Sequence, residues 1–296
     1  MTKKMSEDTQ YWYQRTIDQI ILTGKSDNTA KTYSRDIRIL GRYIDKPLAE
    51  LTEEDIRKFV LYRRNECKLG DSSMRVLICG LRTLYQDLLG KEWPLLKVLK
   101  SKRERRLPIV ISREDVRAIL EHAYMPQHKA YLRVVYSCGL RRNEALDLTV
   151  NDIDGKRHLL HIHGKGARDR YVPLPEKTYQ CLRDYWSTHR NSLYIFPALS
   201  RSNKCAPTAK KPMSTSSVQV GLKKAIKRAG IQRDGIHMHT LRHSYATHLL
   251  ENGLSIKVVQ EYLGHASLQH TINYLHLTNW GKEDAYVKID QMMGEI

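Results

Sequence analysis

Apolar residues recur every three or four positions through the first third of the chain, which is the period of an α-helix. Residues 28–44 follow this period, and Asn28 at their start is a candidate N-cap. Residues 52–66 follow it too, and they open with Thr52 and two acidic residues, which favour a first helical turn. Arginines and lysines occupy the opposite faces of these segments. The pattern therefore predicts amphipathic helices with basic outer faces.

A third helix is predicted over residues 71–89, with Asp71 or Ser72 as its cap, and it completes an all-helical unit over residues 1–96. The next residues, 97–110, contain six lysines and arginines around a single glutamate and show no apolar period. A run of like charges without such a period indicates a linker. It is either a disordered basic tether or a strap that lies along a phosphate backbone.

The remaining residues, 111–296, combine helical and strand patterns. A helical segment leads to a turn at Gly139 and a second helix, and further helices are predicted towards the C-terminus. Residues 158–175 instead alternate with period two, so that His161 and His163 share one face, and two short strands would flank the turn GKGARD. We therefore expect a mainly α chain with one small β-hairpin or sheet.

The composition adds a strong electrostatic signal. The formal charge of +18 over 296 residues is typical of proteins that bind a polyanion, nucleic acid foremost. No stretch of about 20 apolar residues exists, and the N-terminus lacks the apolar segment of a secretory signal, so we expect no membrane partner. The five cysteines are scattered singly, which indicates reduced thiols in a cytoplasmic protein rather than a disulfide or zinc framework.

Histidines crowd into the C-terminal region, and a metal site is one interpretation of them. His239 and His243 have the i,i+4 spacing of metal-binding histidines, but no carboxylate falls at ligand spacing and Arg242 would place a cation beside the ion. We therefore predict no metal there. His239 and Arg242, three residues apart near a helix start, are better suited to binding an anion.

Four segments of the second unit resemble the signature segments of the tyrosine recombinase (phage integrase) family, in the order and spacing of that family. They read GLRRNEALDL at 139–148, GKGARDRYVPL at 164–174, HTLRHSYATHLL at 239–250 and LGHASLQHTINYLH at 263–276. The N-terminal helices also resemble the core-binding domain of that family, and the likeness is nearest to the short two-domain type of the Xer and integron recombinases. It implies an N-terminal helical, SAM-like domain and an α+β catalytic domain.

The resemblance implies that the protein cleaves and rejoins DNA without a metal or other cofactor. The positions that match the catalytic residues of the family are Arg141, Lys165, His239, Arg242, His265 and Tyr274. The two arginines would clamp the scissile phosphate, because guanidinium groups bind two phosphate oxygens at once and stay charged. Tyr274 would be the nucleophile, leaving a 3′-phosphotyrosyl DNA and a free 5′-hydroxyl. Lys165 would protonate the leaving oxygen, His239 would assist proton transfer, and His265 would hydrogen-bond the phosphate.

Other residues compete for some of these roles or support them. Arg142 directly follows Arg141, and Arg168 and Arg170 lie near Lys165 in the same segment. Glu144 is expected to be a buried partner that orients an arginine, and His243 is expected either to have a structural role or to support the catalytic residues.

The resemblance also implies that the protein assembles as a homotetramer on double-stranded DNA carrying a specific core site. Candidate DNA contacts outside the catalytic segments are Lys31, Arg35, Arg75, Arg82, Lys102 and Arg103. Apolar residues of the tail, Tyr286 to Ile296, form a helical stripe that would pack either into a neighbouring protomer or onto its own domain. Two rival functions are a type IB topoisomerase and a DNA-binding regulator without catalysis.

Overall fold

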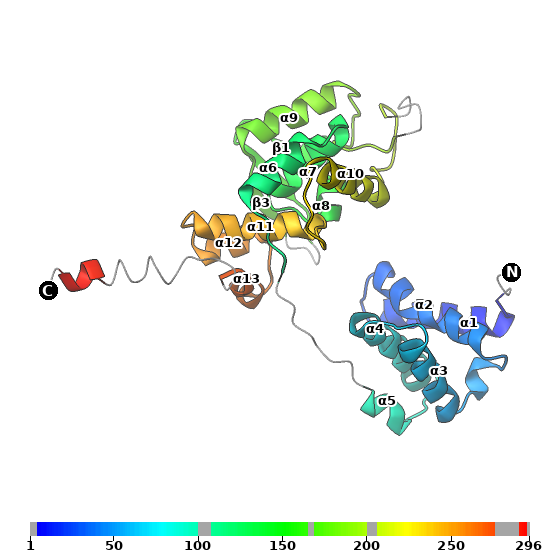
Figure 1. Cartoon of the computed structure of the whole chain (residues 1–296). Helices are drawn as coiled ribbons and strands as arrows, with labels where there is room; N and C mark the ends of the chain where they lie inside the picture. Colours follow the sequence, from blue (N-terminus) through cyan, green and yellow to red (C-terminus); the bar gives the residue numbers. More distant parts are fainter. Residues whose placement is uncertain (1–4, 100–107, 165–168, 200–205, 276–289, 295–296) are drawn as a thin grey trace. The chain divides into compact units, whose positions relative to one another are not determined.

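The computed structural model describes residues 5–99, 108–164, 169–199, 206–275 and 290–294. The chain divides into two compact units, Met1–Arg106 and Leu107–Ile296 (Figure 1). Each unit has its own hydrophobic core. None of the described helices is long and apolar enough to cross a membrane. The mainly helical chain with one small sheet confirms the fold class expected from the periodicity.

The secondary structure that is described for the first unit, over residues 5–99, is helical throughout. Its helices are α1 (Glu7–Leu22), α2 (Asp27–Tyr43), η1 (Leu48–Glu50), α3 (Glu53–Asn65), α4 (Asp71–Arg82), the π-helical turn η2 (Thr83–Leu88) and α5 (Pro94–Val98). Thr52 begins α3 as expected, and Asp55 completes a capping box with it. Two predicted caps are wrong: Ser26, not Asn28, accepts a hydrogen bond at the start of α2, and Gly70 precedes α4 in place of Asp71 or Ser72. The predicted linker lies mostly outside the described residues, and Lys97 belongs to α5.

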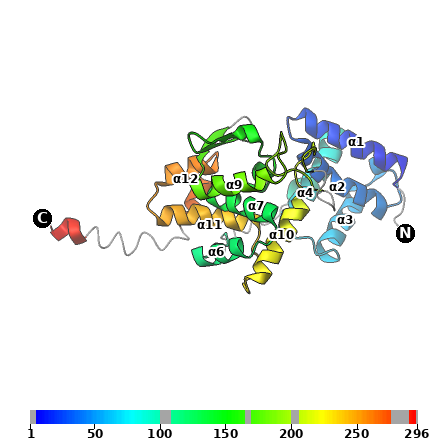
Figure 2. The same cartoon turned by 90° about the horizontal axis from the view of Figure 1, so that it is seen from above.

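The second unit packs helices around a small antiparallel sheet. Its helices are α6 (Arg113–Glu121), α7 (Pro126–Ser137), α8 (Arg142–Leu146), η3 (Val150–Asp152), α9 (Glu176–Ser187), α10 (Thr215–Arg228), α11 (Met238–Glu251), α12 (Ile256–Leu263) and α13 (Leu268–Leu275). Figure 2 shows α7 between α9 and α11, and α7 packs against both. Buried residues of α7, Tyr131, Val134 and Val135 among them, form the centre of the core.

The sheet has three strands in the order β1-β2-β3. The hairpin predicted around GKGARD is present as β2 (Leu159–Ile162) and β3 (Arg170–Pro173), with Leu160 opposite Val172. A third strand, β1 (Ile153–Asp154), pairs with β2 and was not predicted, because two residues are too few to show a period. The sheet thus carries the segment that contains His161, His163 and Arg170 into contact with α12.

Candidate active site

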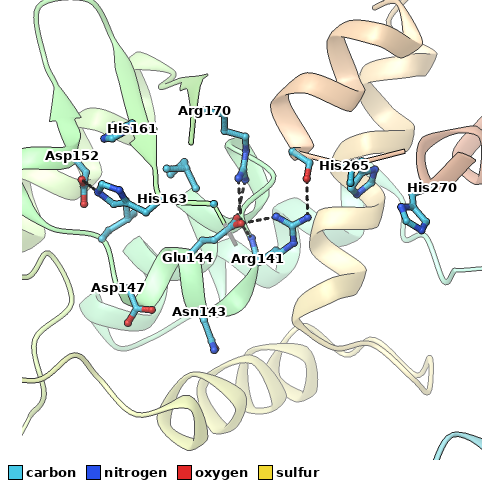
Figure 3. Close-up of a pocket in the computed structure, with 15 residues that line it drawn as sticks. Arg141, Asn143, Glu144, Asp147, Asp152, His161, His163, Arg170, His265 and His270 are labelled. Carbon is cyan, nitrogen blue, oxygen red and sulfur yellow. Dashed lines mark hydrogen bonds and ion pairs between the residues drawn. The ribbon is translucent and has the colours of Figure 1, made fainter. Parts of the chain in front are cut away.

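A cavity of about 830 Å³ opens in the second unit beside the sheet (Figure 3). Arg141 and Glu144 line it from the start of α8, and Arg170 lines it from β3. His265 lines it from the turn between α12 and α13. Segments that are more than 100 residues apart in the sequence therefore place two arginines, a carboxylate and a histidine around one hollow.

Glu144 is the centre of a cluster of three arginines, of which Arg170 and Arg242 are buried. One carboxylate oxygen accepts a hydrogen bond from Arg141 at 2.6 Å, and the other accepts one from Arg170 at 2.8 Å. A nitrogen of Arg242 lies 3.7 Å from the same carboxylate. Burial raises the pKa of Glu144, but the hydrogen bonds and charges of Arg170 and Arg141 outweigh burial and hold the pKa at about 2. The carboxylate is therefore ionised at neutral pH, as the orienting partner expected from the sequence.

Backbone carbonyls of tight turns fix the two arginines. Arg242, on α11, has an exposed side-chain fraction of 3% and donates to the carbonyls of Gly139 and Leu263. Arg141 donates to the carbonyl of Gly264 at 3.1 Å. Gly139 and Gly264 both have left-handed φ angles, +61° and +60°, which glycine adopts without steric cost. A Cβ on Gly139 would lie 2.4 Å from the ring of Tyr245, so this turn also requires glycine for space.

Tyr274, on α13, contacts two histidines. Its hydroxyl lies 2.8 Å from Nδ1 of His243, and its ring is nearly parallel to that of His265, with centroids 6.1 Å apart. Nδ1 of His265 forms a 2.9 Å hydrogen bond with the hydroxyl of Thr271. The side chain of Tyr274 is 3% exposed. The expected nucleophile is thus held inside the site by its histidine neighbours.

Charges and burial set the protonation of these groups. Burial raises the pKa of Tyr274, and the positive charges of Arg242 and Arg141 oppose that rise. Burial, followed by the charge of the same two arginines, lowers the pKa of His265 to about 3. Burial and the neighbouring His239 lower the pKa of His243 to about 4. Both histidines are therefore neutral at pH 7, and a neutral imidazole can accept a hydrogen bond from the hydroxyl that His243 contacts.

Of the two remaining expected catalytic residues, the structure describes His239. His239 is exposed at the start of α11, with its ring centroid 6.3 Å from that of His243. Desolvation, together with the charges of His237 and Arg242, lowers the pKa of His239. Lys165 lies outside the described residues.

The roles of two residues in the site were underestimated from the sequence. Arg170 was considered only as a competitor of Lys165, yet it is buried and binds Glu144 and the carbonyl of Tyr262. His243 was given a structural role, yet it is the hydrogen-bond partner of Tyr274. The place of His243 directly after Arg242 in the motif is the only sequence signal for this contact. Arg142 is not in the cluster and instead contacts Asn143 at 3.3 Å.

The described candidate DNA contacts of the first unit differ in their surroundings. Lys31 and Arg35 are exposed on α2, one turn apart, although Arg35 also contacts Asp36 at 3.2 Å. Arg75 is partly buried on α4. Arg82 donates to the carbonyls of Leu96 and Leu99, so its guanidinium holds α5 in place. Lys102 and Arg103 lie outside the described residues.

Replacing Glu144 with Gln is expected to destabilise the second unit strongly at pH 7. The change leaves the buried arginines without their counter-charge, which costs about 3 kcal/mol or more and lowers Tm by roughly 10 °C. The folded pKa of about 2 lies below that of an unfolded glutamate, about 4.3. The stabilisation is therefore complete above pH 4.5 or so and is lost as the pH falls through about 2. Unfolding measured at pH 7, 4 and 3 should show the gap between wild type and E144Q shrinking.

The exposed pair Glu54–Arg57 provides the control, because it has the same i,i+3 spacing as Arg141 and Glu144. Glu54→Gln is expected to change the free energy of unfolding by less than about 0.5 kcal/mol at every pH. A gap between E144Q and wild type that stays constant from pH 7 to pH 3 would contradict the ionised, arginine-bound state of Glu144.

The chain is similar to known proteins over most of its length. Residues 110–279 match the phage integrase family, and residues 12–95 match the N-terminal SAM-like domain of phage integrases. A tyrosine recombinase of Thermosipho africanus is 32% identical over 277 residues, which cover 89% of this chain and 94% of that protein. The tyrosine recombinase XerD of Oceanobacillus iheyensis is 31% identical over 280 residues, or 89% of this chain and 92% of that protein.

Solved structures show a likeness of fold. A lambda integrase tetramer bound to a Holliday junction matches 90% of this chain and 76% of that chain, with a TM-score of 0.71 and 17% identity.

Proposed function

The chain belongs to the phage integrase family and is a tyrosine recombinase, which cuts and rejoins DNA at specific sites, and we propose that Tyr274 makes the cut by attacking a phosphate held between Arg141 and Arg242. The observation that carries this proposal is the convergence of the two fixed arginines with a buried tyrosine whose hydroxyl contacts a neutral histidine. Two preorganised cations suit the negative charge that develops on the phosphorus in the transition state.

In the proposed reaction, the oxygen of Tyr274 forms a bond to phosphorus while the bond from phosphorus to the 5′ oxygen breaks. His243 accepts the phenolic proton at Nδ1, which lies 2.8 Å from the hydroxyl. Lys165 or His239 gives a proton to the departing 5′ oxygen. The products are a 3′-phosphotyrosyl DNA and a free 5′-hydroxyl. The reverse step, with the 5′-hydroxyl of another strand as the nucleophile, exchanges strands and restores the tyrosine.

The arginines are suited to the clamp because part of each guanidinium is already fixed. Arg242 uses one nitrogen for the Gly139 carbonyl and another for that of Leu263. A guanidinium has five N–H donors, so donors remain for phosphate oxygens after these contacts. Arg141 has a 39% exposed side chain, which gives a bound phosphate access to it from the cavity.

His243→Gln is expected to lower the rate of DNA cleavage by about 10²-fold, because an amide is a far weaker proton acceptor than a neutral imidazole. DNA affinity should change little. The rate is measured in single turnovers with saturating protein, so that binding does not limit it.

His248→Gln is the matched control. His248 lies on the same helix and contacts the hydroxyl of Tyr136 at 2.9 Å, so it has the same chemistry away from Tyr274. This variant is expected to cleave at close to the wild-type rate. Equal rates for the two variants would argue against proton transfer through His243.

We also propose that Lys31 and Arg35 contact DNA phosphates. Both are exposed one turn apart on α2. Replacing both with Ala is expected to reduce the slope of log affinity against log salt concentration by roughly 2, since each phosphate contact contributes about 0.9. Arg64→Ala, which removes an arginine that is already paired with Asp71 at 2.7 Å, should leave the slope almost unchanged. An unaltered slope in the double variant would place the DNA elsewhere.

The proposed assembly is a homotetramer on two double-stranded DNA core sites, in the manner of the lambda integrase tetramer on a Holliday junction. The tail contributes to this proposal because Met292 and Met293 are each 57% exposed. A neighbouring protomer would cover them. The proposed location is the bacterial cytoplasm, in association with the nucleoid, where such DNA is found.

Strand exchange distinguishes this function from its rivals. The purified protein is incubated with a supercoiled plasmid that carries two copies of its core site, and with a second plasmid that carries none. A recombinase is expected to exchange strands between the two sites, which deletes or inverts the DNA segment between them. It should leave the second plasmid supercoiled. Relaxation of both plasmids without exchange would indicate a type IB topoisomerase, and binding without cleavage would leave a DNA-binding regulator.

A further inference from the structure

We propose that Asp152, His161 and His163 bind one divalent metal ion of the Zn²⁺ class at the edge of the three-stranded sheet. This inference is independent of the proposed activity, since none of these three residues has a part in the cleavage step. It concerns a different set of histidines from those of α11.

The three side chains already lie at ligand spacing. One ligand atom from each of them lies within 4.8 Å of the others. Zn²⁺ binds nitrogen and oxygen donors at about 2.0–2.2 Å, so two donors of a tetrahedral site lie about 3.4 Å apart. Nε2 of His163 is 2.9 Å from Oδ1 of Asp152, which is close to that separation. A small inward movement of the His161 ring would complete the set.

The backbone and its neighbours orient each of these donors. His161 and His163 alternate along β2 and its end, and therefore point to the same face of the sheet. The ring of His161 stacks on that of Tyr171 from the adjacent strand, with centroids 4.9 Å apart. Asp152 has an exposed side-chain fraction of only 6%, and Thr149 donates two hydrogen bonds of 2.8 Å to its Oδ2. The second oxygen, Oδ1, is thereby directed at His163.

Asp169 supplies the outer contact that metal-binding histidines require. Its Oδ2 lies 3.3 Å from Nδ1 of His163, on the opposite side of the ring from Asp152. It also lies 3.2 Å from Nε2 of His161. A carboxylate that accepts the second ring N–H of a ligating histidine fixes its tautomer and raises its basicity. The two carboxylates also balance the double charge of the ion, because the histidines bind in their neutral form.

The donor set narrows the choice of ion. Two imidazoles and one carboxylate suit Zn²⁺ and similar first-row ions, whereas Mg²⁺ and Ca²⁺ prefer oxygen donors alone. Three protein ligands leave a position for water or an anionic oxygen. In Figure 3 the labelled Asp152, His161 and His163 lie together on the sheet side of the cavity that Arg141 and His265 line. Within the described ranges of the chain, no other group of three such residues has this spacing.

The experiment is Zn²⁺ titration of the whole chain by calorimetry. Wild type is expected to bind one ion. The double variant His161→Ala with His163→Ala is expected to bind it with an affinity at least about 100-fold lower. Asp169→Asn should weaken binding about tenfold, the usual effect of removing an outer hydrogen bond to a ligating histidine. Because Asp169 is exposed, that variant retains the fold and tests the site even where the double variant is destabilised.

His237→Ala combined with His239→Ala is the matched control. These two histidines have the same i,i+2 spacing and their rings lie 6.1 Å apart, but among the residues that the structure describes they belong to no ligand group with a carboxylate. This variant is expected to bind Zn²⁺ as wild type does. Absence of binding by wild type, or equal binding by wild type, the H161A/H163A variant and D169N, would overturn the proposal. Loss of binding in the control variant alone would also overturn it, because the ion would then belong to α11.

Discussion

Tyr274→Phe is expected to abolish the covalent protein–DNA adduct while leaving DNA binding intact. The hydroxyl is the proposed nucleophile, so its removal should slow cleavage on the order of 10⁴-fold or more. The adduct is measured by denaturing electrophoresis after incubation with a nicked duplex that carries the core site. In this substrate the short 5′-hydroxyl fragment diffuses away after cleavage, which traps the phosphotyrosyl intermediate.

The same substitution should have only a modest effect on stability. The variant loses the 2.8 Å hydrogen bond to His243, which contributes about 1 kcal/mol and lowers Tm by roughly 2–4 °C. Tyr136→Phe is the matched control, because it removes the 2.9 Å hydrogen bond between Tyr136 and His248, which lies on α11 as His243 does. It should lose similar stability and still form the adduct. An adduct in Tyr274→Phe at the wild-type level would exclude Tyr274 as the nucleophile.

Arg242→Lys is expected to reduce cleavage by about 10²–10³-fold although the positive charge is retained. The arginine holds two carbonyls, those of Gly139 and Leu263, while it presents further donors to the phosphate. The single ammonium of lysine cannot meet all of these partners in the same geometry. Misplaced or missing donors at a developing charge cost about this much in rate. Single-turnover cleavage at saturating protein isolates this effect from binding.

The stability of Arg242→Lys must be measured beside its activity, because Arg242 is 3% exposed. A carbonyl left without its donor costs about 1–3 kcal/mol. Arg142→Lys is the control, since the Arg142 side chain donates to its neighbour Asn143 and lies outside the Glu144 cluster. It should cleave normally. Cleavage by Arg242→Lys at the wild-type rate, in a protein that remains folded, would contradict the phosphate clamp.

The structural features that were predicted correctly from the sequence depend on residues that are close together in the chain. The helix start at Thr52, the turn at Gly139 and the β2–β3 hairpin follow from short-range patterns, and the structure contains all three. The cap of α2 was misjudged because Ser26 and Asn28 are both good capping residues two positions apart. The resemblance of the four segments to the family motifs implied that Arg141 and Arg242 share one site, and in the structure both lie at the carboxylate of Glu144.

Long-range contacts could not be predicted in this way. Arg170 resembles any exposed hairpin arginine in the sequence, and only the packing of β3 against α12 buries it beside Glu144. The contact between His243 and Tyr274 likewise depends on how α13 packs on α11. The grouping of Asp152 with His163 joins two segments through the sheet, so their separate patterns gave no sign of a metal site.

The most direct test of the central claim is to identify the amino acid that becomes attached to DNA. The adduct formed on the nicked duplex is digested with a protease and a nuclease, and the modified peptide is sequenced by mass spectrometry. We expect a single nucleotide remnant on the phenolic oxygen of Tyr274, joined through the 3′-phosphate. A remnant on another of the 17 tyrosines, or a linkage through a 5′-phosphate, would contradict the mechanism.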